Sequence, residues 1–325
     1  MKSALVTGAY GYIGSVLCKM LNEQGYSVIG IDSDFNKRIV SRIKYCDQFL
    51  FTDFIGSTNE SIYYRIANNP NISVFHLAAN SLLGPSIKDP LPYFYNNVAK
   101  TIELITYLGP NNNFIFASSA AIYNNDDTVK NEEQIPHPPN NYGLSKLMVE
   151  TVLNSVYDSR KIRAASFRFF NVIGAYEDTG QLPDTPHIVN QLIDKTLQQK
   201  AFIINGDNYN TPDGTCIRDY LHVVDVCRAL IHADNYLTEI KSPCHKIYNL
   251  GTNTGTSVME IVKSFKLMTK STTNINIGPR RQGDPDRLIA NPSKFMKETN
   301  FKYKYNSKDI NSMIKSAWDY RNNNF

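Results

Sequence analysis

Apolar runs and segments of helical spacing alternate along the first half of the chain. The apolar runs cover residues 3–8, 27–32, 73–79, 113–121 and 163–171. Segments whose apolar residues recur every three or four positions separate them, at 12–24, 96–108 and 142–157. Buried strands that alternate with amphipathic helices are typical of a doubly wound parallel sheet, so we expect an α/β fold of the Rossmann type.

The second half of the chain is less regular. Loops rich in Gly, Pro and Asp follow the fifth apolar run. A helix over about 224–235 and a strand at 246–251 then indicate a return to the sheet. We therefore expect a Rossmann domain at 1–171, with a return through about 220–251, and a smaller α/β domain that binds substrate at 172–325.

The composition is that of an ordinary globular protein and excludes several functions. The 325 residues are enough for about two cores, 42% of them are hydrophobic, and the net charge of +4 is spread along the chain. This charge is too mild for a nucleic-acid partner, but it suits a small anionic ligand. No apolar run is long enough to cross a membrane, and the N-terminal residues lack the apolar stretch of a signal peptide. We therefore expect a cytoplasmic protein.

Cysteine and histidine usage argues against metal or disulfide chemistry. The chain has five cysteines, an odd number without a C-x-x-C pair, and six dispersed histidines. Scattered thiols of this kind are typical of a reducing compartment. We expect no metal site.

A glycine-rich turn follows the first apolar run. In "TGAYGYIG", residues 7–14, Gly8, Gly11 and Gly14 stand between a predicted strand and a predicted helix. Glycines allow a tight turn there and let the backbone approach a pyrophosphate at the helix N-terminus. Taken alone, the three glycines fit a purely structural turn about equally well.

An acidic residue ends the second apolar run and makes the dinucleotide interpretation stronger. Asp32 lies 18 residues beyond Gly14, where a carboxylate accepts hydrogen bonds from an adenosine ribose. Ser33 and Asp34 follow it, so a 2′-phosphate would meet negative charge, and we expect NAD in preference to NADP. Asp53 is a second candidate, for the adenine amine, although a strand-end cap explains it equally well.

A tyrosine and a lysine stand one helical turn apart in "NNYGLSKLMVE". Pro138 and Pro139 interrupt the chain before it, and Asn140 or Asn141 can cap the helix that follows. Tyr142 and Lys146 then share one helix face. Such a pair is usually only the edge of an amphipathic helix, but beside a dinucleotide site it gains a chemical use.

The chemical use of this pair depends on the pKa of the tyrosine. Ionising a free phenol at pH 7 requires about 4 kcal/mol, and an ammonium about 4 Å away contributes roughly that amount at an effective dielectric constant near 20. An oxidised nicotinamide adds a second positive charge. We therefore expect Lys146 and the nicotinamide together to lower the pKa of Tyr142 and make the phenolate a base for a sugar hydroxyl.

Two serines end the fourth apolar run. Ser118 and Ser119 stand where strand ends meet a cofactor crevice, and a hydroxyl there can hydrogen-bond to the group that reacts with the tyrosine. Two serines that leave a strand into a turn are the alternative.

With these motifs the chain resembles the extended short-chain dehydrogenase/reductase family, and within it the UDP-glucose (UDP-galactose) 4-epimerases. The glycine turn, the Ser/Tyr/Lys set and "FHLAA" are shared by the whole extended family. More specific matches are "RFFNVIGA" (168–175), "GDNYNTPDGTCIRDYLHVVDV" (206–226), "YNLGTNTGTSVMEI" (248–261) and "GPRRQGD" (278–284). The resemblance covers nearly the entire chain.

The resemblance implies a role for particular residues of this chain. It implies Ser119, Tyr142 and Lys146 as the catalytic group, with all three near the cofactor or the sugar. It implies further NAD contacts from Tyr12, Ile13, Phe54, Leu77, Ala78, Ala79 and Asn97. It implies UDP-sugar contacts from Asn171, Asn205, Arg218, Arg281, Asp284 and Leu288. The planar fork of an arginine matches phosphate oxygens, which suits Arg218 and Arg281 to a diphosphate.

Some positions depart from the family pattern. Ser81 stands where some members have a lysine on the cofactor diphosphate, and Asn205 stands where a phenylalanine often packs on the uracil. The segment 180–191 aligns poorly with the family's nucleotide-binding loop, so no residue in it is assigned. The catalytic set is unaffected.

The implied activity is reversible inversion at C4 of UDP-glucose and UDP-galactose through a 4-keto intermediate, with NAD recycled, in a homodimer. One alternative is a 4-epimerase of a UDP-N-acetylhexosamine, UDP-pentose or UDP-uronate. A second is a nucleotide-sugar dehydratase or decarboxylase of the same family. Dehydratases place an Asp-Glu pair where this chain has Ala120 and Ala121, which argues against them. A non-catalytic NAD-binding regulator is disfavoured because Ser119, Tyr142 and Lys146 are all present.

Overall fold

The computed structural model describes residues 2–33, 42–52, 66, 69, 71–110, 112–281, 283–305 and 309–325. The chain divides into two compact units. Unit 1 comprises Met1–Asn124, Ile135–Arg168 and Cys227–Tyr248, and unit 2 comprises Asn125–Gln134, Phe169–Val226 and Asn249–Phe325.

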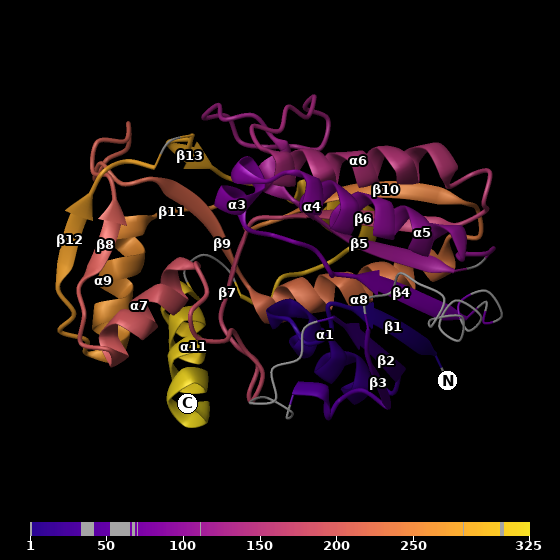
Figure 1. Ribbon diagram of the computed structural model, residues 1–325, viewed down its shortest axis with the longest axis horizontal. Helices are drawn as coiled ribbons and strands as arrows, with labels where there is room; N and C mark the ends of the chain where they lie inside the picture. The colour runs from indigo at the N-terminus through magenta and orange to yellow at the C-terminus, as the bar shows by residue number, and fades with distance from the viewer. Residues whose placement is uncertain are drawn as a thin grey trace. The chain divides into compact units, whose positions relative to one another are not determined.

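Unit 1 is built on a sheet that, in the described residues, has seven strands in the order β10-β6-β5-β4-β1-β2-β3 (Figure 1). The strands are β1 (Ser3–Thr7), β2 (Ser27–Asp32), β3 (Gln48–Phe51), β4 (Ile72–His76), β5 (Asn113–Ser119), β6 (Arg163–Phe169) and β10 (Cys244–Leu250). The pairings β1 with β2, β1 with β4, β2 with β3 and β4 with β5 are parallel. The strand order reverses between β1 and β4, so the predicted doubly wound α/β fold is confirmed.

Helices accompany this sheet. Those near 12–24, 96–108, 142–157 and 224–235 were predicted from the sequence, whereas those within 83–93 and at 120–122 were not. The helices are α1 (Tyr12–Glu23), α3 (Leu83–Lys88), α4 (Leu91–Tyr93), α5 (Lys100–Thr106), α6 (Asn141–Val156) and α8 (Val223–Glu239), with a π-helix, η3 (Phe94–Ala99), and a 3₁₀ turn, η4 (Ala120–Ile122). Helices α3, α4 and α5 all contact α6, and Figure 1 shows the four together beside β5. Helix α8 is attached to β4 and β5 by Asp234, which accepts hydrogen bonds from Ser73 and Asn113.

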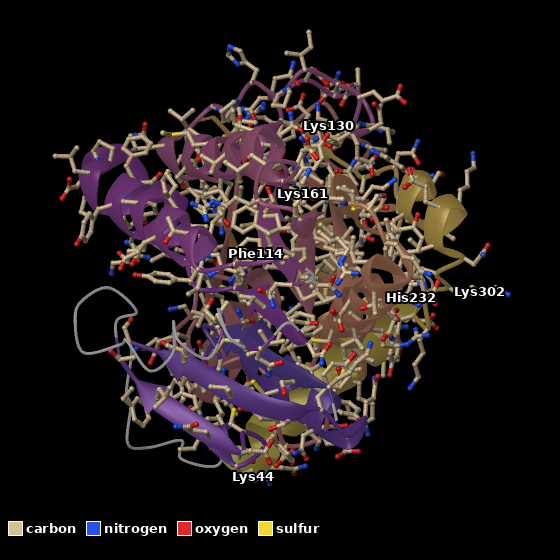
Figure 2. All side chains as sticks on the ribbon, turned by 90° about the vertical axis from the view of Figure 1, so that its right-hand side faces the viewer. Lys44, Phe114, Lys130, Lys161, His232 and Lys302 are labelled. Carbon is tan, nitrogen blue, oxygen red and sulfur yellow. The ribbon has the colours of Figure 1, made fainter. Side chains whose placement is uncertain are left out.

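The core of unit 1 lies between the sheet and the helices η3, α5 and α6. Phe114 of β5, which is labelled in Figure 2, is fully buried there. Val149 and Leu153 of α6 belong to the same buried cluster. These two α6 residues follow Tyr142 and Lys146 at helical spacing. Burying them fixes the rotation of α6, and thereby the face on which the tyrosine and the lysine lie.

One predicted helix has a more complex form than the sequence indicates. The segment expected at 96–108 begins as the π-helix η3 and continues as α5. A π-helical turn inserts one extra residue, and such turns are frequent at functional sites. Asn97 on η3 donates from its side-chain amide to Asn80 O at 3.0 Å and to Ser145 Oγ at 3.0 Å. The π-helix therefore turns a polar side chain inward, where it connects the segment after β4 to α6.

Unit 2 contains smaller sheets and its own helices. Its strands are β7 (Asn171–Ile173), β8 (Phe202–Asn205), β9 (Ile217–His222), β11 (Gly255–Ser257), β12 (Ile275–Gly278) and β13 (Arg287–Leu288). Its helices are α7 (Ile188–Leu197), α9 (Val258–Thr269), α10 (Ser293–Thr299) and α11 (Ile310–Asn324). Strand β9 pairs with β7, β11 and β13, and β8 pairs with β12. A core of buried residues from α7, α9 and α11 stabilises these elements.

A buried ion pair attaches the last helix of the chain to α7. Arg321 of α11 donates to Asp194 Oδ1 at 2.6 Å and to Asn190 Oδ1 at 2.5 Å. Both partners lie on α7, and the exposed fraction of the side chains in the ion pair is only 4% for Arg321 and 10% for Asp194. The segment 180–187 is held to the same carboxylate, since Asp184 N donates to Asp194 Oδ2 at 3.0 Å.

Candidate active site

The glycine turn between β1 and α1 leaves no room for side chains. Gly8 has a φ of +71°, and a Cβ there would lie 2.8 Å from Ala78 N. A Cβ on Gly14 would lie 2.0 Å from Gly8 O. The glycines at 8 and 14 are therefore required for packing of the turn, whereas Gly11 is exposed at the start of α1.

The N-terminus of α1 fits an anion. Gly11 is its N-cap, so no side chain caps the helix, and its first turn contains no acidic residue. Helix N-termini of this kind attract phosphate groups through their amides and the helix dipole. Asp32, at the end of β2, is attached to the same turn, because its Oδ2 accepts a hydrogen bond from Tyr10 N at 3.0 Å. A bare turn, an uncapped helix and a nearby carboxylate are the groups that a dinucleotide requires, so the residues present fit NAD.

The other residues expected at the cofactor are placed in part. Ala78 follows β4 and touches the glycine turn, since Ala78 N donates to Thr7 Oγ1 at 3.2 Å. Leu77 N donates to Thr7 O at 3.1 Å, so Leu77 lies at the same edge of the sheet. Asn97 of η3 contacts the segment that follows β4, because its side-chain amide donates to Asn80 O. Tyr12 and Ile13 are the first residues of α1, and Ala79 lies in the segment that follows β4. Asp53 and Phe54 lie outside the described residues.

Helix α6 begins where the sequence predicts and approaches η4 closely. Asn140 is the N-cap, and its Oδ1 accepts a hydrogen bond from Gly143 N at 2.8 Å. A Cβ on Gly143 would lie 2.1 Å from Ala121 O. The helix therefore lies directly against the turn that follows β5, which brings Tyr142 to the end of that strand.

The three expected catalytic residues come together at this point. Lys146 is 2% exposed, and its Nζ donates to Ala117 O of β5 at 2.8 Å. The same Nζ lies 5.9 Å from the centre of the Tyr142 ring. A hydrogen bond between Tyr142 and Ser119 lowers the pKa of the phenol, although burial has the larger, opposite effect. Ser119 Oγ also accepts a hydrogen bond from Ala121 N at 3.1 Å, so Ser119 has a structural role as well.

In the protein without NAD, the pKa of Tyr142 is not lowered. Burial raises the pKa of Tyr142 above its ordinary value, and the neighbouring Tyr93 adds to the increase. Burial also lowers the pKa of Lys146 to about 7, although the charge of Glu150 opposes it. Burial removes both groups from water and favours the neutral form of each, an effect that the spacing of the two residues does not reveal.

A buried polar cluster lies directly behind the expected catalytic residues. Ser118 donates to Glu150 on α6, Glu150 forms an ion pair with Arg168 on β6, and Arg168 donates to the Tyr123 hydroxyl. Sequence analysis assigned no role to Glu150 or Arg168. Two signals were present, because Arg168 is a charge within an apolar run and Glu150 stands four residues after Lys146.

Unit 2 brings together several residues expected to bind the nucleotide. Arg218 of β9 lies beside Asp284, with 3.7 Å between Nη2 and Oδ2, and donates to Pro285 O at 3.0 Å. Leu288 of β13 is the register partner of Arg218. Asn171 of β7 pairs with Tyr220, two residues farther along β9.

An open pocket of about 500 Å³ in unit 2 is lined by residues 125–127, 280, 281 and 283–286. Arg281 is exposed on it, whereas Arg280 is held by Asp286 at 2.6 Å and stacks on the Tyr209 ring at 4.0 Å. Arg281 is therefore the better placed of the two to bind an external anion. Asn205 is exposed at the end of β8, where it pairs with Gly278, just before this segment. The contribution of 125–127 was missed, because nothing in their sequence links them to 280–286.

Two further properties concern only the part of the chain that the structure describes. No helix there is both long enough and apolar enough to cross a membrane. No group of three or more His, Cys, Asp or Glu side chains there is arranged to hold a metal ion.

Comparison with known proteins identifies the family. The model of the "NAD dependent epimerase/dehydratase family" matches residues 4–251. The UDP-glucose 4-epimerase of Corynebacterium glutamicum is 33% identical over 97% of this chain and 94% of its own. The UDP-glucose 4-epimerase of Bifidobacterium longum, solved with NAD⁺ and UDP, has a TM-score of 0.86 at 28% identity, and covers 99% of this chain and 98% of its own. The UDP-Glc/GlcNAc 4-epimerase of Campylobacter jejuni has a TM-score of 0.82 at 30% identity, with 99% and 100% covered. The chain therefore belongs to the NAD-dependent epimerase/dehydratase family, and within that family to the UDP-glucose 4-epimerases.

Proposed function

We propose that this chain catalyses the reversible inversion of C4 in UDP-glucose and UDP-galactose, with NAD as a retained cofactor. The observation that carries the proposal is the arrangement of Tyr142, Lys146 and Ser119 at the end of β5. A buried amine, a phenol and a hydroxyl meet there in a unit that also contains the uncapped α1 N-terminus. Proton transfer at a sugar hydroxyl requires such a group.

Residues of unit 1 would hold the cofactor. The amides at the start of α1 would bind the pyrophosphate, and Asp32 would accept hydrogen bonds from the adenosine ribose. The segment Leu77–Ala79 and Asn97 would line the cofactor from the end of β4. When bound, NAD would supply the group that accepts a hydride from C4 and gives it back.

Tyr142 would move the proton of the C4 hydroxyl. Tyr142 and Lys146 titrate as a coupled pair, in which phenolate with ammonium and phenol with amine hold the same number of protons. The phenolate form accepts the hydroxyl proton as C4 becomes a ketone, and the phenol returns that proton when C4 is reduced. Ser119 orients the sugar oxygen. Protons and electrons balance over the cycle, because each is returned to the sugar.

Residues of unit 2 would bind the UDP portion of the substrate. Arg218 and Arg281 present planar guanidinium groups suited to diphosphate oxygens. Asp284 would hydrogen-bond to the uridine ribose. Asn171 and Asn205 would contact the diphosphate-sugar and the base, and Leu288 would lie beside the C2 substituent of the sugar. We assign NAD binding to residues 1–171, with a return through 220–251, and substrate binding to 172–325.

A second copy of this chain is the expected protein partner. Helices α4, η3, α5 and α6 contact one another and carry exposed apolar side chains. These side chains are Leu91, Tyr95, Ile102, Leu144 and Met148. Apolar side chains gathered on adjacent helices favour burial against another surface. A homodimer through these helices, in the cytoplasm, is therefore part of the proposal, and sedimentation at equilibrium would give the mass of two chains, whereas a single-chain mass would contradict it.

Epimerisation of another UDP-sugar is the second candidate function. The likeness to the UDP-Glc/GlcNAc 4-epimerase supports it. The family resemblance implies a tyrosine at position 288 in enzymes confined to the hexose pair, and Leu288 is smaller than a tyrosine. A dehydratase is disfavoured, because Ala120 and Ala121 supply no acid or base for elimination.

The direct test is incubation of the purified protein with UDP-galactose, and separately with its N-acetyl analogue, followed by separation of the products. We expect UDP-glucose from the first, and slow formation of the N-acetyl product from the second. Exclusive use of the N-acetyl substrate would favour the second candidate, and loss of water from either substrate would indicate a dehydratase.

A further inference from the structure

A buried ion pair connects α6 to β6 directly behind the catalytic residues. Glu150 accepts hydrogen bonds from Arg168, with 3.1 Å between Nε and Oε1 and 2.7 Å between Nη2 and Oε2. Both side chains are only 3% exposed. Removing two charges from water costs several kcal/mol per ion, so stabilisation of the fold alone does not account for a buried ion pair.

The pair is attached to the strand that carries Ser119. Ser118 Oγ donates to Glu150 Oε1 at 2.5 Å, and Lys146 Nζ donates to Ala117 O at 2.8 Å. Helix α6 is thus attached to two successive residues of β5, through side chains one helical turn apart. The next residue along β5 is Ser119, so these two contacts fix the position of its hydroxyl relative to Tyr142.

Glu150 also acts on the charge of Lys146. Burial lowers the pKa of Lys146 to about 7, and the carboxylate of Glu150 raises it. His76 of β4 is neutral near pH 7, because burial and the charge of Lys146 lower its pKa to about 3. Tyr93 of α4 also stays neutral, since burial raises its pKa.

Two more polar groups lie in the cluster around Glu150. Arg168 of β6 carries a positive charge, and the Tyr123 hydroxyl beyond η4 accepts its Nη1–H at 2.8 Å. Among the described residues, Glu150 is therefore the negative charge that raises the pKa of Lys146, and Arg168 is the positive charge paired with Glu150.

We propose that Glu150 is a positioning residue of the epimerase reaction, whose carboxylate fixes the end of β5 beside Ser119 and favours the ammonium form of Lys146. This role rests on the proposed function, because it acts through the Tyr142–Lys146 pair. Arg168 holds the carboxylate in place and limits its effect.

The test compares pH profiles of kcat for the NAD-loaded wild type and Glu150→Gln. Loss of a negative charge lowers the proton affinity of both members of a coupled pair. We expect the whole pH profile of Glu150→Gln to move to lower pH by about one unit. A neighbouring charge typically shifts a pKa by about one to three units, and one unit is the lower end of that range. Ultraviolet absorbance of the Tyr142 phenolate, taken as the difference from Tyr142→Phe, should move in the same direction without relying on turnover.

Three further variants separate charge from structure. Glu150→Asp keeps the charge and should restore the position of the profile, even with a lower kcat. Ser118→Ala removes the hydroxyl anchor and should lower kcat without moving the profile. Arg168→Gln leaves Glu150 without its counter-charge and should move the profile to higher pH, and it decides the question alone if Glu150→Gln does not fold.

The outcomes distinguish this inference from the proposed function. A wild type without epimerase activity contradicts the proposed function. An active wild type whose profile and phenolate absorbance coincide with those of Glu150→Gln, after scaling, overturns the role of Glu150. A downward shift in Arg168→Gln would overturn it as well.

Discussion

Replacing Lys146 by methionine should stabilise the protein while it abolishes activity. Lys146 is 2% exposed and hydrogen-bonds with Ala117 O, and methionine is an apolar side chain of similar length. Turnover should fall at least about 100-fold, because Tyr142, the proposed base, loses its neighbouring ammonium group. The free energy of unfolding should rise, because burying the amine of Lys146 destabilises the folded wild type.

The magnitude of the stabilisation follows from the pKa of Lys146. Burial lowers that pKa from 10.5 to about 7. At about 1.4 kcal/mol per unit, this shift means that folding with a charged Lys146 costs roughly 5 kcal/mol. Removing the amine also leaves Ala117 O without its donor, which costs about 1–3 kcal/mol. The free energy of unfolding of Lys146→Met at pH 7 should therefore exceed that of the wild type by about 2–4 kcal/mol.

The sign of the pH dependence provides a second measurement. The folded pKa of Lys146 lies below its unfolded value of 10.5, so the destabilisation is fully present below about pH 7. Between about pH 7 and 10.5 the unfolded chain binds one more proton, and the stability of the wild type rises by up to about 1.4 kcal/mol per pH unit. The difference between Lys146→Met and the wild type should shrink across this range.

Urea unfolding of nucleotide-free protein at several pH values is the appropriate assay. Lys315→Met is the matched control, because Lys315 is exposed on α11 and pairs with Asp319 at the surface. Its free energy of unfolding should stay within about 0.5 kcal/mol of the wild type. Lys146→Met that is no more stable than the wild type, with the same pH dependence, would refute the reasoning.

Three other predictions concern the cofactor, the sugar and the fold. The protein should be purified with NAD bound, because an enzyme that recovers its own hydride gains nothing by releasing it; NADP in the supernatant of denatured protein would contradict the assignment of Asp32. Leu288→Tyr should suppress activity on UDP-N-acetylhexosamines and spare the hexose reaction, by about 1–3 kcal/mol of discrimination; an unchanged ratio of the two activities would place the determinant elsewhere. Arg321→Met should lower the free energy of unfolding by about 3 kcal/mol, because it leaves the buried Asp194 without its ion-pair partner; urea unfolding with a change below about 0.5 kcal/mol, the size of an ordinary surface substitution, would contradict this role.

Periodicity predicted strands β1, β2 and β5 well because almost all of their residues are buried, on both faces of the sheet. Strands β1, β2 and β5 are continuous apolar runs, and their limits differ from the expected ones by at most two residues. The cap of α6 was also foreseeable, since prolines precede Asn140 and an asparagine side chain readily satisfies a free helix amide. The π-helix at Phe94–Ala99 was not, because an inserted residue leaves the apolar spacing nearly unchanged.

The electrostatics of the site could not be obtained from spacing. Tyr142 and Lys146 stand one turn apart, as expected, but their pKa values depend on how much water the fold removes from them. The same limit applies to Glu150, whose ion pair with Arg168 requires α6 and β6 to be adjacent. The pocket near Arg281 depends on residues 125–127, which are distant in sequence and join unit 2 only in the folded chain.

The central claim is that Tyr142 transfers the proton of the C4 hydroxyl. The most direct test is the rate at which Tyr142→Phe converts UDP-galactose into UDP-glucose, measured beside the wild type with the bound NAD of both proteins quantified. We expect the rate to fall at least about 100-fold, as for loss of a positioned general base, while the NAD content and the fold are retained. A Tyr142→Phe protein that holds NAD and turns over at nearly the wild-type rate would contradict the mechanism.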